Sequence, residues 1–481
     1  MSPRIAIVAF AALIAGLFYL NWNRKARTSP ALWIPVIWLL IASSRSVSQW
    51  LGAMGLAATP ITLETGDQYL DGSPLDRNIF TGLLAFGVIA LISRRRRVAS
   101  LFKSNLPILL FFLYCGLSTL WSDYSGVAFK RWIKALGDVV MILIVLTETD
   151  RLAALKRVLS RAAFILIPLS VLLIKYYPDL GREYRPDFGF WKLSYTGVTT
   201  SKNSLGMMTL IFGLGCSWQF LSTLRTSRSI RRIYQLVAHG VLLGMVFCLF
   251  WIINSATAMA CFVIGTGLMV ATSLRKMQRR PALVHVLVIG TIAMALFALF
   301  LDSEGTLVGT LGRNTTLTGR TDIWRLTLGL AGNPWVGTGF ESYWLGARLQ
   351  KIWDLYWWHP REAHNGYLEI YLSLGWIGVC MLALLLFNGY HNITRSFLRG
   401  PEVGGLRLSL FVIAVIYNLT ESVFRMSNPV WIMFLMALMA VAKGPAKRIS
   451  SATVEGAHDD LATDDAGVDH MIYVRSYQEV V

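Results

Sequence analysis

The chain has 481 residues, of which 55% are hydrophobic and only 15% are charged. A soluble domain usually carries about 25% charged residues, so most of this chain is expected to lie in a membrane. The formal net charge of +18 does not indicate a nucleic-acid-binding protein, because the basic residues form short clusters between apolar runs. The five cysteines all lie inside apolar runs without a CxxC pair, which favours packed hydrophobic residues over disulfides or metal ligands.

Apolar runs recur along almost the whole chain, and a bilayer core requires roughly 20 apolar residues per helical span. They fall at about 5–22, 31–43, 78–93, 105–121, 132–147, 162–176, 204–221, 234–253, 256–273, 283–301, 365–388, 406–421 and 428–442. The second, third and fifth runs are short or carry charge, so the sequence predicts an all-α polytopic membrane bundle of 12 or 13 helices. The first run is predicted to be a retained span, because no small-residue cleavage site follows it.

Basic clusters follow every second run, which places those loops in the cytoplasm, the N-terminus outside and the C-terminus inside. The opposite loops then face outward, and three are long: about 44–77, 175–203 and 302–363. A structureless loop as long as 302–363 is unusual, so we expect short helices in it, one of them over Thr321–Gly332. The predicted domains are a membrane-embedded region, 1–450, and a disordered acidic cytoplasmic tail, 451–481.

The outward loops contain many cations that the orientation rule does not explain, which suggests an anionic ligand at the outer surface; the alternative is solvated charge or lipid head-group contact. Arg320 precedes a predicted helix, where free N–H groups favour anions, and Arg313 lies shortly before it. Lys202 and Asn203 lead into the run at 204–221, whose helix a Ser or Asn can cap. Lys202 is alternatively an interfacial lysine that extends toward water.

The long loop ends at His364-Asn365, directly before an apolar run. A histidine in the first turn of a helix is expected to be neutral, because the helix dipole disfavours the imidazolium, and a neutral imidazole suits a general base. Glu369 lies about one turn deeper and is either a functional group or a structural partner of a cation. Glu421 and Arg425, four residues apart, are expected to pair with each other.

The same loop is rich in aromatic residues, which suit either sugar stacking or an interfacial belt. They are Trp324, Trp335, Phe340, Tyr343, Trp344, Trp353, Tyr356, Trp357 and Trp358. The sequence contains no nucleotide-binding loop, HExxH motif or zinc spacing, so an activated nucleotide sugar is not the expected donor.

Four stretches in this order resemble the O-antigen ligase and O-antigen polymerase superfamily, and more narrowly its exopolysaccharide-polymerising branch, the ExoQ type. They are Gly197–Gly206, Gly319–Trp324, Asn333–Gly339, and His364-Asn365 followed after nine residues by Gly375-Trp376-Ile377-Gly378. The resemblance covers about residues 195–445.

This resemblance implies a helical fold with one large periplasmic loop and no metal or other cofactor. It implies an inner-membrane glycosyltransferase that moves a glycan from undecaprenyl diphosphate to an acceptor hydroxyl at the periplasmic face. His364 would act as the base or position the acceptor; Arg320, Lys202 and Arg313 would contact the diphosphate. Supporting roles are expected for Asn365, Glu369, Asn203 and Arg361.

The expected partners are a lipid-linked oligosaccharide, membrane lipids, and chain-length regulator and export proteins. An O-antigen ligase, which attaches polymer to lipid A core, uses the same chemistry and remains an alternative to the polymerase. A lipid-linked sugar transporter is a different class, although no inverted repeat or broken central helix indicates one. A structural scaffold for export would tolerate loss of His364.

Overall fold

The computed structural model describes residues 2–23, 27–56, 72–187, 190–300, 317–356 and 358–440. Every apolar run predicted above lies on a helix. The helices are α1 (Pro3–Leu20), η1 (Pro30–Leu32), α2 (Trp33–Ala42), α3 (Val47–Ala53), α4 (Pro74–Ile92), α5 (Arg95–Ser104), α6 (Leu106–Leu117), η3 (Ser118–Trp121), α7 (Ser125–Leu146), α8 (Arg151–Tyr176), α9 (Pro178–Gly181), α10 (Lys202–Leu224), α11 (Ile230–Ile253), α12 (Ala256–Thr272), α13 (Arg275–Arg279), α14 (Pro281–Phe300), α16 (Leu317–Gly329), α17 (Gly346–Leu355), α18 (Gly366–Arg399), α19 (Pro401–Tyr417) and α20 (Pro429–Leu438).

The prediction of an all-α polytopic membrane bundle is confirmed. Within the described residues, six helices are long and apolar enough to cross a bilayer: α1, α4, α8, α10, α11 and α18. Two bent pairs raise this number to eight, Pro30–Ala42 with Val47–Ala53 and Arg95–Ser104 with Leu106–Trp121. The remaining predicted spans fall on the shorter apolar helices α12, α14 and α20 and on α7 and α19. The acidic tail, 451–481, lies outside the described residues.

Burial separates the central helices of the bundle from the peripheral ones. Most of α8 and α10 is buried, whereas α1 and α4 expose apolar side chains such as Phe86 and Ile89. An apolar side chain that faces outward on a long helix is suited to contact with lipid. The apolar helices thus supply both the core of the bundle and its lipid-facing surface.

Hydrogen bonds between distant segments show that the chain alternates between two ends of the bundle. At the basic end, Arg94 after α4 pairs with Glu148 after α7, and Lys156 of α8 pairs with Glu402 of α19. At the opposite end, which we call the site end, Arg45 after α2 donates to the carbonyls of Leu180 and Gly197, before α10. This alternation matches the predicted one, since the basic loops share one end and the long loops share the other.

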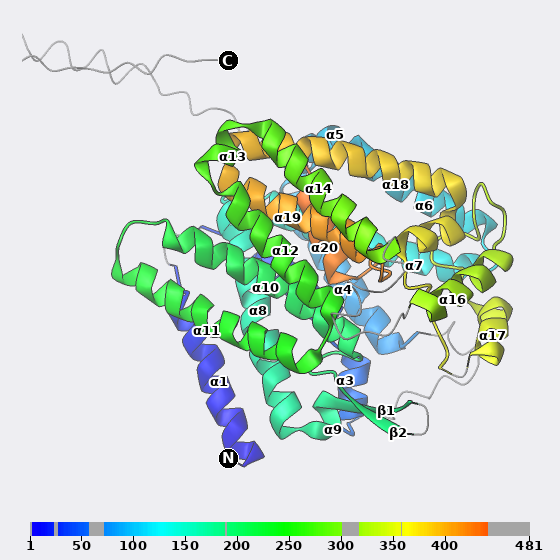
Figure 1. Ribbon diagram of the computed structural model, residues 1–481, viewed down its shortest axis with the longest axis horizontal. Coiled ribbons are helices and arrows are strands. Elements are labelled where there is room, and N and C mark those ends of the chain that lie inside the picture. Colours follow the sequence, from blue (N-terminus) through cyan, green and yellow to red (C-terminus); the bar gives the residue numbers. More distant parts are fainter. Residues whose placement is uncertain are drawn as a thin grey trace, which may run out of the picture. The chain divides into compact units, whose positions relative to one another are not determined.

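The long loops at the site end contain secondary structure (Figure 1). A two-stranded antiparallel hairpin, β1 (Arg182–Asp187) and β2 (Phe190–Tyr195), pairs Arg182 with Tyr195 at its base, and the sequence analysis did not predict it. The helix expected over Thr321–Gly332 is found as α16, which begins four residues earlier, and α17 follows it. Figure 1 shows the hairpin, α16 and α17 along the lower right side of the bundle.

Several aromatic residues of the last long loop form a small core of their own. This core contains three buried aromatic residues, Tyr343, Trp344 and Trp353. They pack with Ile352 of α17 and with Leu372 of α18. Trp335, by contrast, is exposed. Most of these rings therefore stabilise the loop instead of forming a platform for sugars, and the loop gains a fixed position above α18.

Candidate active site

Two glycine-rich motifs meet at a break inside α18. Gly375 has a φ of 63°, which interrupts the helix, and the N–H groups of Trp376 and Ile377 donate to the carbonyls of Pro334 and Trp335. A Cβ on Gly375 would lie 2.3 Å from the backbone carbon of Trp335. Only glycine tolerates both the left-handed backbone and this close approach. The number of residues between His364 and Gly375 therefore sets the distance from the start of α18 to the point where Pro334 and Trp335 contact the helix.

The docking continues toward the start of α18. The N–H groups of Thr338 and Gly339 donate to the carbonyls of Leu372 and Ser373, at 3.1 and 2.9 Å. The break at Gly375 leaves these carbonyls without an N–H donor from the helix, and buried backbone carbonyls need a hydrogen-bond partner. The N–H groups of the loop supply it. These bonds also hold the segment that contains Glu341 and Trp344 beside the first turns of α18.

The turn before α18 places His364 outside the helix. Asn365 is the N-cap residue, and its side chain accepts hydrogen bonds from the N–H groups of Tyr367 and Leu368. His364 itself has a φ of 52°, so its backbone is left-handed, a strained conformation that often marks functional positions. The expected supporting role of Asn365 is thus a structural one, because it fixes the turn that carries the histidine.

The loop between α19 and α20 forms the opposite wall of the site. Asn418 is fully buried, and its side-chain oxygen accepts from the N–H groups of Val423 and Phe424. The Asn418 carbonyl accepts from Gly366 N–H at 2.9 Å, which ties this loop to the start of α18. Asn418 therefore shapes the segment that contains Glu421 and Arg425.

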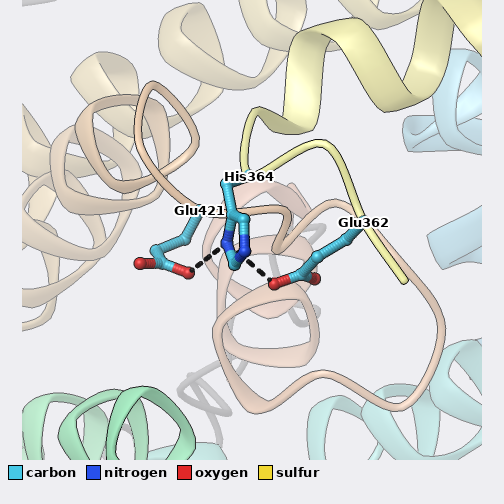
Figure 2. A group of neighbouring side chains, drawn as sticks. All are labelled: Glu362, His364 and Glu421. Atoms are coloured by element: carbon cyan, nitrogen blue, oxygen red, sulfur yellow. Dashed lines mark hydrogen bonds and ion pairs between the residues drawn. The ribbon is translucent and has the colours of Figure 1, made fainter. Parts of the chain in front are cut away.

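His364 lies between two carboxylates (Figure 2). Its Nδ1 is 3.1 Å from Oε1 of Glu362 and 3.3 Å from Oε2 of Glu421. The His364 side chain is 21% exposed and Glu362 is 28% exposed, whereas Glu421 is only 8% exposed. Both carboxylates therefore contact the same nitrogen of the imidazole, while one side of the cluster stays open to solvent.

Two arginines complete the cluster. Arg320, in the first turn of α16, lies 3.6 Å from Oε1 of Glu421 and donates to the Thr420 carbonyl at 2.7 Å. Asn203 of α10 donates to the same carboxylate at 3.2 Å. Arg425 lies 3.3 Å from Oε2 of Glu362 and 3.6 Å from Oε2 of Glu341. These three side chains and His364 bring together segments that are more than 200 residues apart in the chain.

The expectation of a neutral imidazole is wrong for this arrangement. Burial lowers the pKa of His364, but the hydrogen bonds and charges of Glu362 and Glu421 outweigh this effect and raise the pKa to about 10. Burial also acts to raise the pKa of Glu362, yet the bond to His364 and the charge of Arg425 leave that pKa below its usual value. At neutral pH the site therefore contains an imidazolium and an ionised carboxylate, because carboxylate contact exceeds the dipole effect used in the sequence analysis.

The ligand atoms of Glu362, His364 and Glu421 all lie within 4.8 Å of one another, which is close enough for a divalent cation. Both carboxylates, however, contact the same imidazole nitrogen, and each also pairs with an arginine. A cation would have to replace a proton and two guanidinium contacts. The donor set found here is that of a protonated ion-pair network, which satisfies these groups without a metal.

The structure brings five predicted site residues to one place: Arg320, Asn203, His364, Asn365 and Glu369. Glu369 accepts from Trp344 Nε1 at 2.8 Å and from the N–H of Ala363, so it holds the segment next to His364. Ser201 caps α10, as expected for this segment, and Lys202 opens the helix beside Asn203.

One predicted residue, Arg361, packs in the aromatic core of the loop. The Arg361 guanidinium lies 5.5 Å above the Trp353 ring, in the aromatic core of the loop. Arg313 lies outside the described residues. Arg361 therefore packs against the aromatic core of the loop.

Several groups of the site were not predicted from the sequence. Glu362 and Glu341 were not selected, and Glu421 and Arg425, expected to pair with each other, have the partners described above. A usable signal was present: Asn418, Glu421 and Arg425 interrupt the apolar C-terminal region where no orientation rule requires polar residues.

Comparisons with known proteins agree with the motifs. A family model described as O-antigen ligase matches residues 240–383, which include Arg320 and His364. The exopolysaccharide production protein ExoQ of Rhizobium meliloti (strain 1021) is 26% identical over 337 residues, which cover 67% of this chain and 74% of that protein. The predicted resemblance to the O-antigen ligase and polymerase superfamily is confirmed.

The O-antigen ligase match covers only part of the cluster in this chain. Asn203 precedes the matched residues, and Glu421 and Arg425 follow them. Segments before and after the matched region, α10 and the loop between α19 and α20, therefore contribute to the site, including the buried carboxylate that contacts both His364 and Arg320.

Proposed function

We propose that the protein polymerises exopolysaccharide or O-antigen-like repeat units at the periplasmic face of the bacterial inner membrane. The donor would be a glycan on undecaprenyl diphosphate, and the acceptor a sugar hydroxyl. The observation that carries this proposal is the convergence of Arg320, Arg425 and His364 at the site end of an apolar bundle. The likeness to an exopolysaccharide production protein favours polymerisation over ligation to lipid A core.

The charges of the cluster suit a diphosphate leaving group. When the bond from the sugar carbon to the phosphate oxygen breaks, negative charge develops on the diphosphate. Fixed cations at that point stabilise the transition state. Arg320 and the His364 imidazolium supply such cations, and both are held by Glu421 before substrate binds. We therefore assign His364 to the diphosphate side of the reaction.

The acceptor hydroxyl must lose a proton as its oxygen bonds to the sugar carbon. Glu362 is the more exposed of the two carboxylates and is ionised at neutral pH, so we assign it as the acceptor of that proton. This proposal moves the general-base role from the imidazole to a carboxylate beside it. It requires no metal, and activity is expected to persist in excess chelator.

A purified-protein assay tests this function directly. The protein in detergent or lipid receives lipid-diphosphate-linked oligosaccharide without nucleotide sugar, and the products are separated by length. Longer lipid-linked products support the proposal. Transport without lengthening would instead indicate a flippase. In cells, a deletion that leaves full-length but unattached polymer would indicate a ligase, whereas loss of long polymer with single repeats on lipid supports a polymerase.

A further inference from the structure

A second, strongly basic cavity lies between α4 and α7, outside the His364 cluster. Its volume is about 330 Å³, and four cations line it: Arg77, Lys130, Arg131 and Lys134. Among the described residues of this lining, Asp76 is the single carboxylate, and it already accepts from the N–H and the hydroxyl of Ser48. The described part of the lining therefore has an excess of positive charge that suits an anion.

Apolar side chains also line the same cavity. Phe80, Leu84, Ile133 and Trp38 line it, and Lys134 lies 4.1 Å from the centre of the Phe80 ring. Helix α4 also exposes apolar residues such as Phe86 along its outer surface. A cavity that combines several cations with apolar walls fits a phosphate attached to a lipid better than a free phosphate.

The cavity adjoins the His364 cluster through two shared segments. Arg131 donates to the Glu341 carbonyl, and the Glu341 carboxylate lies 3.6 Å from Arg425. Met426 lines the cavity directly after Arg425. Asp138 of α7 accepts from the next N–H, that of Ser427, at 2.8 Å, so this wall is fixed in place.

We propose that the cavity between α4 and α7 binds the diphosphate of a second lipid-linked glycan, the one that is not bound at Arg320 and His364. The inference rests on the proposed function, because polymerisation joins two glycans that are both carried on lipid diphosphate. The cluster holds the diphosphate of the donor, whose bond to the sugar breaks. The α4–α7 cavity holds the diphosphate of the acceptor, whose bond to its sugar is kept.

The charge balance of the two sites supports this division. At the His364 cluster, Arg320 and Arg425 are already paired with Glu421, Glu362 and Glu341, so an incoming anion must compete with carboxylates. Among the described residues that line the α4–α7 cavity, four cations face one carboxylate, and Asp138 and Glu341 lie close enough to Lys134 to act on its charge. Cations are still in excess over the carboxylate of the described lining, which favours a bound anion. A site that holds one substrate throughout the reaction is best served by an excess of cations. A site that stabilises a leaving group only in the transition state is better served by cations that are already paired with carboxylates.

Native mass spectrometry of the purified full chain with glycan-free undecaprenyl diphosphate tests the proposal. The wild type should bind two molecules. The double variant Arg77→Gln/Lys130→Gln changes two exposed side chains and should bind one; the variant Arg320→Gln should also retain one, in the α4–α7 cavity. Arg325→Gln changes an 84% exposed cation of α16 and should retain both. Loss of the charged contacts should weaken the second binding step roughly tenfold, so the variants are compared at the probe concentration that half-saturates this step in the wild type.

A single bound molecule in the wild type would overturn the proposal, as would two molecules in the Arg77→Gln/Lys130→Gln variant. Competition identifies the lipid. Displacement by an equal concentration of phosphatidylglycerol would show a site for bulk anionic lipid and contradict the assignment. Failure of the proposed function gives a different result: two molecules bind, but oligosaccharide is not lengthened. Binding and lengthening measured on the same purified protein therefore distinguish failure of the second lipid site from failure of the polymerase function.

Discussion

Both ends of the bundle contain a buried glutamate that pairs with an arginine, but the two glutamates have different roles. At the basic end, Glu148 accepts from Ser29 N–H at 2.9 Å, from the Ser29 hydroxyl at 2.6 Å and from Arg94 at 2.8 Å. At the site end, Glu421 is shared by Arg320, Asn203 and His364. The first carboxylate joins three helical segments, and the second holds groups that can also bind a substrate.

Exposure distinguishes the two arrangements. The side chains of Arg94 and Glu148 are 14% and 2% exposed, whereas those of His364, Glu362 and Arg425 are 21%, 28% and 34% exposed. A closed ion pair has no room for another partner, so it serves stability. A partly open cluster keeps its geometry through buried members and reaches solvent through the others, as a preorganised site requires.

Replacement of the imidazole gives the largest expected effect on activity. The variant His364→Ala should lose long polymer, with a fall in turnover of roughly 100-fold or more, because one cation at the leaving group is removed. Its abundance in the membrane should remain normal. Polymer length on gels and immunoblots of membranes measure the two quantities. His285→Ala is the matched control, since His285 contacts Tyr390 on the bundle surface; an equal loss there would contradict a specific role for His364.

Breaking the ion pair at the basic end should lower stability and leave turnover unchanged, which is the reverse of the effect expected for His364→Ala. Arg94→Ala leaves the Glu148 carboxylate buried without its cation, which costs roughly 3–5 kcal/mol of stability for a buried pair. Membrane abundance and thermal stability should fall, while turnover per folded molecule stays unchanged. Fluorescence-detected size exclusion after heating measures the first, and the lengthening assay the second. A variant with normal stability and impaired turnover would show that the two ends are not divided in this way.

The pH profile tests the protonation state of the cluster. His364 has a raised pKa of about 10, so the imidazolium is fully present at neutral pH and is lost as the pH rises through that value. We expect kcat/KM to be constant from pH 7 to 9 and to fall above about 10. In Glu421→Gln one carboxylate contact is lost, the pKa of His364 falls, and the decline should begin at lower pH. A rise in kcat/KM between pH 7 and 9 would show instead that neutral imidazole is the base.

Much of the architecture followed from local features of the chain. Apolar runs predicted every long helix, because a span must satisfy its own backbone within lipid. The start of α18 and its histidine were predicted from His364-Asn365 and the following run. Arg320 was selected by its place before a helix, and it lies in the first turn of α16.

The partners within the cluster depend on contacts that local features do not encode. Glu421 meets Asn203 from 218 residues away, and Arg425 meets Glu362 from 63 residues away. The protonation of His364 was mispredicted partly for the same reason, because the carboxylate of Glu421 is distant in the sequence. The other carboxylate, Glu362, lies only two residues before His364 and was overlooked. The hairpin was missed since its strands are only six residues each, within a loop treated as a unit.

Arg361 gives the smallest expected effect and sharpens the boundary of the site. It is only three residues before His364, and its guanidinium lies over Trp353 in the aromatic core of the loop. Trp353 is buried but Arg361 is exposed, and a solvent-exposed cation over an aromatic ring contributes about 0.5–1 kcal/mol, so Arg361→Ala should lower stability slightly. Turnover should change less than about threefold, because the diphosphate cations at Arg320 and His364 remain in place. A loss in the lengthening assay as large as that of His364→Ala would extend the site along the loop to Arg361, and the aromatic core would then have to move toward the cluster when substrate binds.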